Sequence, residues 1–223
     1  MHLKFVEMSL EKINGPTDTK ELSTCLSLAV LGTMSDAGKS IITAGLCRIL
    51  ANHDISVAPF KAQNMSNNST PALLPPPGGH RRNITPDPER NSSDNVALNA
   101  LDEHTGYGEI GTAQALQAEA CRIVPRVEMN PVLLKSGGRR ASDGAYLCSV
   151  IVMGKQVACE DYGTLKSRTG TLRSLVLKAH EDLAHVTGAQ AILIEGAGSC
   201  TELNLMERDI VNLPLVREVS CII

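Results

Sequence analysis

The sequence predicts an α/β fold in which a mostly parallel sheet carries helices on both faces. Two mostly apolar runs, Leu26–Leu31 and Ala189–Ile194, indicate strands buried on both faces, as the strands of parallel sheets are. Helical periodicity follows the first run and precedes the second, most clearly over residues 164–186. A glycine-rich turn joins the first strand to the first helix, which is the order typical of nucleotide-binding α/β domains.

Composition limits the classes of protein that the chain could be. It has 223 residues, enough for one sizeable domain, and only 2% aromatic residues, so the core must be built from Leu, Ile, Val and Ala. A net charge of −3 gives no basic surface for nucleic acid or anionic membrane. No apolar run reaches the ~20 residues of a membrane span, and the N-terminus lacks the apolar core of a secretory signal. The seven cysteines are odd in number and form no C-x-x-C pair, which is typical of reduced thiols in a cytoplasmic protein.

The chain divides into a polar N-terminal extension, residues 1–24, and a domain that occupies residues 25–223. Residues 66–95 are rich in Pro, Gly, Asn and charge without periodicity, which predicts a disordered insert in that domain. The last residues, 219–223, look like the first half of a buried strand. We therefore expect the fold to be truncated at the C-terminus, and the sheet edge exposed by lost strands predicts marginal stability or self-association.

The helix after Ser40 is expected to turn an apolar stripe of Ile42, Leu46, Ile49 and Leu50 toward the sheet. A strand, Ile55–Phe60, follows it. After the insert the pattern predicts a helix over Thr112–Ile123 with Ala113, Leu116 and Ala120 inward, strands at Asn130–Lys135 and Tyr146–Val152 with a polar turn at Gly137–Gly144 between them, and a long helix that ends at Gly188.

The turn after the first strand reads Gly32-Thr33-Met34-Ser35-Asp36-Ala37-Gly38-Lys39-Ser40, the pattern of a phosphate-binding loop. Gly38 lets the backbone approach a phosphate, and the helix that begins here presents unpaired N–H groups to the anion. Lys39 adds a positive charge, and the Ser40 hydroxyl can bind Mg²⁺. Five residues rather than the standard four separate the two glycines. The sequence therefore predicts a nucleotide site.

The second buried strand ends in Glu195-Gly196-Ala197-Gly198. A carboxylate at the C-terminal end of a parallel strand, followed by small residues, suits a ligand of Mg²⁺ or of water that faces the phosphate-binding loop. The alternative interpretation is a solvated loop glutamate.

Five segments together resemble the N-terminal ATPase half of the glutamine-dependent adenosylcobyric acid synthases. The resemblance extends over about residues 26–215 and is more specific than the loop alone, which dethiobiotin synthetase and MinD/ParA-type ATPases share. The segments are Gly32–Cys47, Ala58–Met65, Gly108–Ala120, Met129–Lys135 and Ile194–Asn212.

The resemblance implies that ATP activates peripheral carboxylates of a corrinoid, plausibly as acyl phosphates, and that ammonia converts them to amides. It implies nucleotide binding by Gly32, Thr33, Asp36, Ala37, Gly38, Lys39 and Ser40; metal binding by Ser40, Glu195 and Asp209; catalytic roles for Lys61, Glu195 and Asp209; and substrate binding by Gln63, Asn64, Glu109 and Asn204. Lys61 has the alternative of a solvated lysine at a strand end. Gln114 and Gln117 are expected to be helix-surface or packing residues.

The chain also departs from the family. Members continue into a glutaminase domain with a catalytic Cys and His, which nothing here resembles, so ammonia would come from elsewhere. The insert follows Asn64 closely, and Cys200 stands where the family usually has a proline. Two alternatives therefore stay open: a fragment without a competent site, and a MinD/ParA-like nucleotide switch, which the substrate-type segments disfavour.

Overall fold

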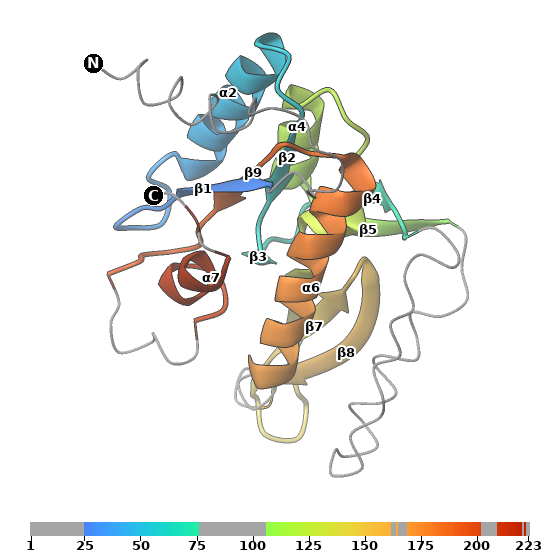
Figure 1. Cartoon of the computed structure of the whole chain (residues 1–223). Helices are drawn as coiled ribbons and strands as arrows, with labels where there is room; N and C mark the ends of the chain where they lie inside the picture. Colours follow the sequence, from blue (N-terminus) through green and yellow to red (C-terminus); the bar gives the residue numbers. More distant parts are fainter. Residues whose placement is uncertain are drawn as a thin grey trace.

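The computed structural model describes residues 25–75, 106–161, 164, 169–201, 209–219 and 221. This part of the chain contains both strands and helices, with groups of consecutive strands between the helices (Figure 1). In chain order they are β1 (Leu26–Val30), α2 (Lys39–Asn52), β2 (Val57–Phe60), β3 (Gln63–Met65), β4 (Ser69–Leu73), β5 (Tyr107–Gly111), α4 (Thr112–Ala120), the 3₁₀ helix η1 (Val127–Met129), β6 (Val132–Arg139), β7 (Tyr146–Val152), β8 (Lys155–Asp161), α6 (Thr169–Thr187), β9 (Ala191–Glu195) and α7 (Leu213–Glu218).

A three-stranded parallel sheet forms the centre of the fold. Its order is β1-β9-β2, so the strand that is last in sequence lies between the first two. Leu193 of β9 is paired with Leu28 of β1 on one side and with Pro59 of β2 on the other. Leu193 and its neighbours on β9 are fully buried, which explains the unbroken apolar run in the sequence. The predicted α/β fold with a parallel sheet is confirmed.

Helices cover both faces of this sheet (Figure 1), with α2 and α4 on one side and α6 and α7 on the other. Successive residues of a strand point to opposite faces. Leu193 accordingly packs with Cys47 of α2, whereas Ile192 and Ile194 pack in the core that includes Val176 of α6. The sheet therefore separates two apolar cores.

The face that α2 turns to the sheet only partly matches the expected one. Leu46 and Leu50 are half-buried against the core there, as predicted. Ile42 and Ile49, predicted to face the sheet, are 53% and 55% exposed, whereas Thr43 and Cys47 are fully buried. The buried row begins at Lys39 and repeats every four residues. Because the side chain of Lys39 is fixed inside the loop that precedes it, as described below, the loop sets the rotation of the helix.

A second sheet, of order β3-β6-β7-β8, continues from the first. Only Lys61 and Ala62 separate β2 from β3, and the Lys61 backbone N–H donates to the Met129 carbonyl over 2.8 Å. β3 then runs parallel to β6. One continuous segment of chain thus belongs to both sheets.

The antiparallel part of this second sheet was not fully predicted. The strand over Tyr146–Val152 is confirmed, but β6 extends to Arg139, which pairs with Tyr146, so the predicted turn at Gly137–Gly144 is too long. The strand β8 was missed. Its residues are polar or half-buried and have no long apolar run, so the pattern used for buried strands cannot find it.

The predicted insert at residues 66–95 begins too early. Ser69–Leu73 form β4, which pairs antiparallel with β5, and Ala72 is fully buried. Pairing partners that are distant in sequence supply this order, which local composition does not reveal. Residues 76–95 lie outside the described part of the chain.

Two further expectations concern the ends of the chain. The extension 1–24 lies outside the described residues, as does most of the strand expected over 219–223; Val219 itself directly follows α7. None of the helices that the structure describes is long and apolar enough to cross a membrane.

Candidate functional site

The glycine-rich segment forms an exposed loop between β1 and α2, with residues 33–38 open to solvent. Asp36 and Gly38 have φ values of 55° and 84°, in the left-handed region that lets the chain turn sharply. Gly38 is the N-cap of α2, and no side chain caps the helix start. The first N–H groups of α2 are thus left to an anion. The loop brings together all seven residues predicted to bind nucleotide.

The side chain of Lys39 runs back through this loop. Its ammonium group donates hydrogen bonds to the carbonyls of Met34, at 2.7 Å, and Gly198, at 3.0 Å. A side chain at Gly32 would place its Cβ 3.1 Å from Cδ of Lys39, so glycine leaves the room that the lysine needs. Lys39 therefore connects the loop to the segment after β9, close to where a bound phosphate chain would lie.

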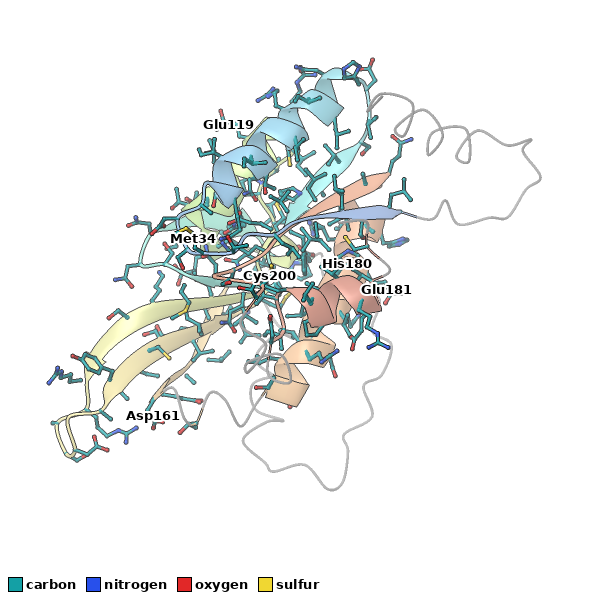
Figure 2. All side chains as sticks on the ribbon, turned by 90° about the vertical axis from the view of Figure 1, so that its left-hand side faces the viewer. Met34, Glu119, Asp161, His180, Glu181 and Cys200 are labelled. Atoms are coloured by element: carbon teal, nitrogen blue, oxygen red, sulfur yellow. The ribbon has the colours of Figure 1, made fainter. Side chains whose placement is uncertain are left out.

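A second contact connects the same two segments. The Cys200 backbone N–H donates to the Gly32 carbonyl over 3.0 Å, and Figure 2 labels Cys200 and Met34 at this end of the sheet. Proline has no N–H group. The proline that the resemblance leads us to expect here could not donate this hydrogen bond, which joins the loop to the β9 exit.

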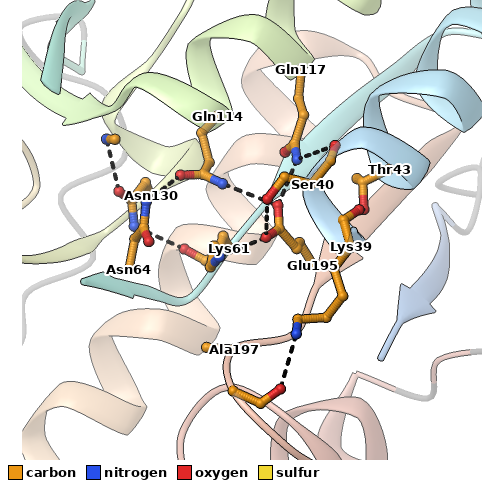
Figure 3. Close-up of polar contacts among 12 residues, drawn as sticks. Lys39, Ser40, Thr43, Lys61, Asn64, Gln114, Gln117, Asn130, Glu195 and Ala197 are labelled. Carbon is orange, nitrogen blue, oxygen red and sulfur yellow. Dashed lines mark hydrogen bonds and ion pairs between the residues drawn. The ribbon is translucent and has the colours of Figure 1, made fainter. Parts of the chain in front are cut away.

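Glu195, at the C-terminal end of β9, is the centre of a buried polar network (Figure 3). Its side chain is 1% exposed, which excludes the solvated glutamate considered above. Oε1 accepts hydrogen bonds from Ser40 Oγ at 2.7 Å and from Lys61 Nζ at 2.6 Å. Oε2 accepts from the Gln117 amide at 2.6 Å and from the Gln114 amide at 3.3 Å. Four donors compensate the burial of this carboxylate.

The two glutamines are the residues that sequence reasoning missed. Gln114 and Gln117 are fully buried, whereas Leu116, predicted to point inward, is 48% exposed. The apolar pattern of α4 was right for Ala120, which is buried, and wrong for Leu116, because the helix buries the two glutamine side chains. A signal existed: glutamines three residues apart share one face of a helix, beside Ala118 and Ala120, which are also buried.

Lys61 and Asn64 join the network from the segment that connects β2 to β3. Lys61 is 8% exposed and forms a buried ion pair with Glu195, so it is not a solvated strand-end lysine. The Asn64 amide donates to Gln114 Oε1 over 2.8 Å. Asn130 holds the same segment through a hydrogen bond from its amide to the Lys61 carbonyl, at 3.1 Å. Gln63 is half-buried at the start of β3.

Glu109 belongs to a separate cluster on β5. Its Oε2 accepts hydrogen bonds from Ser69 Oγ, at 2.5 Å, and from Lys135 Nζ. Partial burial raises the pKa of Glu109, but the hydrogen bonds from Lys135 and Ser69 outweigh it and leave the pKa below its usual value. None of its described hydrogen bonds reaches Glu195.

Asp209 organises the start of α7. Its Oδ1 accepts from the backbone N–H groups of Val211, at 2.7 Å, and Asn212, at 3.0 Å, and its Oδ2 accepts from the Asn212 amide. Asn212 in turn bonds both backbone groups of Ala197, two residues after Glu195. Within the described contacts, Asp209 therefore meets the β9 exit through Asn212 and not through Ser40 or Glu195. Asn204 lies outside the described residues.

The oxygen atoms of Ser40 and Glu195, at the end of the phosphate-binding loop, suit Mg²⁺ as ligands. Ser40 Oγ and Glu195 Oε1 are hard oxygen ligands 2.7 Å apart. Two oxygens bound at right angles to Mg²⁺ lie about 3 Å apart, so a small opening of this contact would accommodate the ion. No group of three His, Cys, Asp or Glu side chains in the described residues is arranged to hold a metal. One carboxylate beside a phosphate-binding loop is the sparse protein contribution that Mg²⁺ takes when phosphates supply the other ligands.

Comparison with known proteins agrees with this geometry. Residues 28–206 match the family described as CobQ/CobB/MinD/ParA nucleotide binding domain. The chain is 40% identical over 195 residues to the cobyric acid synthase of Chlorobium phaeobacteroides (strain BS1), a match that covers 87% of this chain and 31% of that protein. No match was found among solved structures.

Two other relatives give the same picture. The cobyric acid synthase of Streptomyces coelicolor is 40% identical over 194 residues, 85% of this chain and 30% of the relative. The probable cobyric acid synthase of Methanocella arvoryzae is 39% identical over 196 residues, 86% of this chain and 31% of the relative. The chain thus spans about a third of the length of these relatives and resembles cobyric acid synthases throughout that third. It belongs to the CobQ/CobB/MinD/ParA nucleotide-binding domain family.

Proposed function

We propose that this chain carries the ATP-using site of a cobyric acid synthase, which activates peripheral carboxylates of a corrinoid for amide formation. The main support is the buried ion pair of Lys61 and Glu195, which a hydrogen bond from Ser40 connects to the end of the phosphate-binding loop. A nucleotide switch needs the loop and a metal-binding carboxylate. A buried lysine beside both, joined to polar residues on β3 and α4, suits transfer of a phosphoryl group to an anionic acceptor better.

On the nucleotide side, the residues Gly32, Thr33, Asp36, Ala37, Gly38, Lys39 and Ser40 would hold the phosphates. The N–H groups at the start of α2 supply donors, and Lys39 can exchange the Met34 and Gly198 carbonyls for phosphate oxygens. Mg²⁺ at Ser40 and Glu195 would neutralise charge on the phosphates.

On the acid side, the substrate carboxylate would attack the terminal phosphorus, with ADP leaving. Ammonia would then attack the acyl carbon of the acyl phosphate, with phosphate leaving and one proton lost from nitrogen. Lys61 is proposed to lie between the two anions and reduce their repulsion. Gln63, Asn64, Glu109 and Asn204 are proposed to bind the corrinoid, and Asp209 to assist on the metal side.

The partners follow from the same proposal. Ammonia would come from a glutaminase domain outside this chain or from solution, and the corrinoid is the small-molecule substrate. We propose a cytoplasmic location and self-association through the sheet edge, with neither nucleic acid nor a membrane as partner; the net charge of −3 supports the last point.

Binding of Mg·ATP is the first test. We expect the chain to bind a fluorescent ATP analogue in the presence of Mg²⁺ and to release phosphate when a corrinoid acid and ammonium are both added. Lys39→Ala should abolish binding while leaving the melting curve largely unchanged, because Lys39 contacts loop carbonyls rather than the apolar core.

Other outcomes would separate the alternatives. Phosphate release that responds to a protein partner or to DNA, and not to a corrinoid acid, would favour a nucleotide switch. A folded chain that binds no nucleotide would contradict the proposal and favour the fragment without a competent site.

A further inference from the structure

The two oxygens of Glu195 face different parts of the molecule (Figure 3). Oε1 meets the proposed nucleotide side, through Ser40 and Lys61. Oε2 meets two neutral amides of α4, those of Gln114 and Gln117. The orientation of the carboxylate therefore depends on α4 as much as on β9.

Gln117 ties Glu195 to the start of α2. Its amide donates to Glu195 Oε2 at 2.6 Å and to the Ser40 carbonyl at 3.3 Å. Its Oε1 is buried with no hydrogen-bond partner among the described residues. Turning the amide around would put that oxygen against the carboxylate. The side chain thus leaves its acceptor oxygen unsatisfied and keeps its N–H donors on Glu195 and Ser40. This arrangement is the one expected of a residue that orients the carboxylate.

Gln114 ties Glu195 to the proposed acid side. Its amide donates to Glu195 Oε2, and its Oε1 accepts from Asn64 at 2.8 Å. The hydrogen bonds thus point in one direction: Asn64 donates to Gln114, and Gln114 donates to Glu195. Gly111 makes this path possible, because a Cβ there would lie 2.2 Å from the Asn64 amide nitrogen and 2.8 Å from Gln114 Oε1.

We propose that Gln114 and Gln117 are positioning residues that orient Glu195 for Mg²⁺, and that Gln114 links the state of Asn64 to that orientation. A ligand that accepts the hydrogen bond of the Asn64 amide takes this donor away from Gln114 Oε1. The Gln114 side chain is then held less firmly, which changes its contact with Glu195 Oε2. Occupation of the acid side and metal binding on the nucleotide side are then coupled through one buried side chain. The proposal rests on the proposed function, because it assumes that Mg²⁺ and nucleotide bind at Ser40 and Glu195.

The test separates metal-dependent from metal-independent nucleotide binding. A fluorescent ATP analogue is titrated in EDTA and then with increasing Mg²⁺, using the whole chain. Gln117→Met, which keeps the side-chain length and removes both donors, should raise the half-saturating Mg²⁺ concentration about tenfold, the size expected for loss of a hydrogen bond to a charged group. Affinity in EDTA should change less than about twofold. Gln156→Met, the same change at an exposed position on β8, is the matched control.

The link to Asn64 has its own comparison. Asn64→Ala should raise the half-saturating Mg²⁺ concentration in the wild-type background and have little further effect in Gln114→Met. Should Gln117→Met fail to fold, as a thermal melt would reveal, Gln117→Leu also removes both donors and adds no charge beside Glu195.

The outcomes are distinguishable. Equal Mg²⁺ dependence in wild type and in the Gln117 variants, with nucleotide still bound, overturns the positioning role and leaves the proposed function intact. An Asn64→Ala effect that is the same in both backgrounds overturns the link through Gln114. A wild-type chain that shows no Mg²⁺-dependent nucleotide binding overturns both this inference and the proposed function.

Discussion

At the scale of single residues, the structure is distinguished by a buried ion pair. The side chains of Lys61 and Glu195 are 10% and 1% exposed, and Lys61 Nζ lies 2.6 Å from Glu195 Oε1. Such a pair is costly to bury and contributes little net stability compared with apolar side chains of the same size. Removing Lys61 alone, however, leaves the buried Glu195 charge without a cationic partner, with only the neutral donors of Ser40, Gln114 and Gln117. This asymmetry predicts how variants should behave.

We expect Lys61→Met to lower the free energy of unfolding by about 3 kcal/mol, because it leaves the buried Glu195 carboxylate without its cationic partner. The double variant Lys61→Met with Glu195→Gln should recover part of that loss, because neither charge remains. Urea unfolding measures both. Lys178→Met, which breaks an exposed pair with Asp182 on α6, is the control and should cost at most about 0.5 kcal/mol. A Lys61 variant as stable as the control would contradict the prediction.

His180 is a second residue whose chemistry is set by burial. It lies on α6 against the sheet (Figure 2), with Nε2 3.0 Å from Ser27 Oγ and its ring edge-on to Phe60. Burial lowers the pKa of His180 to about 4. The unfolded chain therefore takes up a proton between about pH 6.5 and pH 4 that the folded chain does not.

The contribution of His180 to stability is accordingly complete above its unfolded pKa and is lost as the pH falls toward 4. We expect the free energy of unfolding to drop by roughly 1–3 kcal/mol over this interval through His180 alone. Thermal melts at about pH 7.5 and about pH 5 should differ less in His180→Gln than in wild type. His53→Gln changes an exposed histidine after α2 and should leave the pH dependence as it was. Equal pH dependence in wild type and His180→Gln would count against the prediction.

At the scale of elements, the turn between β7 and β8 packs directly on β5. Met153 and Gly154 both have positive φ, 46° and 79°, as in the tight hairpin turns that suit twisted strands. The Glu109 N–H donates to the Gly154 carbonyl over 3.0 Å, and a Cβ on Gly154 would lie 2.5 Å from Cγ1 of Val127 and 2.9 Å from Gly108 Cα. The hairpin is attached to the rest of the fold at a point that admits only glycine.

Gly154→Ala should therefore cost more than its backbone conformation alone requires. Gly144, in the turn between β6 and β7, also has positive φ, at 71°, but nothing lies within 4 Å of its Cβ position. We expect Gly144→Ala to cost about 1 kcal/mol and Gly154→Ala roughly 2–4 kcal/mol, measured by urea unfolding. Similar losses for the two variants would show that the hairpin turn can move away from β5.

The elements also show where sequence reasoning succeeds. The strands β1 and β9 were found because a mostly apolar run of six residues, next to a glycine-rich turn, is typical of a strand buried on both faces. Helix orientation was less predictable. Leu46, Leu50 and Ala120 lie inward as predicted, but Ile42, Ile49 and Leu116 do not, because buried polar side chains take part of the inward face of each helix. β4, whose order comes from its pairing with β5, could not be recognised from local composition.

At the scale of the whole molecule, the loop motif and the tip of β9 predicted that Ser40 and Glu195 face each other, and the family resemblance implied Lys61 and Asn64. Glu195 and Ser40 meet because the C-terminal ends of parallel strands and the loops that follow them share one edge of the sheet. The contributions of α4 were missed: the spacing of Gln114 and Gln117 places both on one face of the helix, but whether that face meets Glu195 depends on the angle at which the helix crosses the sheet.

The central sheet has an open side that bears on assembly. Among the described strands, β1 pairs with β9 alone, so its other edge presents unpaired backbone groups. Such an edge favours pairing with another chain. We expect sedimentation velocity to show a weight-average mass that rises with protein concentration, together with a broad thermal transition. A single monomeric species with a sharp, cooperative melt would contradict this.

The segment shared by the two sheets has a consequence for which changes the chain can accept. Lys61 and Asn64 are three residues apart on it, so their Cα atoms are never more than about 11 Å apart, whatever the ligands do. Insertion or deletion of one residue here would turn Asn64 to the opposite face and break its contact with Gln114. The number of residues between these two positions is therefore constrained more strongly than their identity. The proposed distance from the phosphate to the acceptor carboxylate depends on that number of residues.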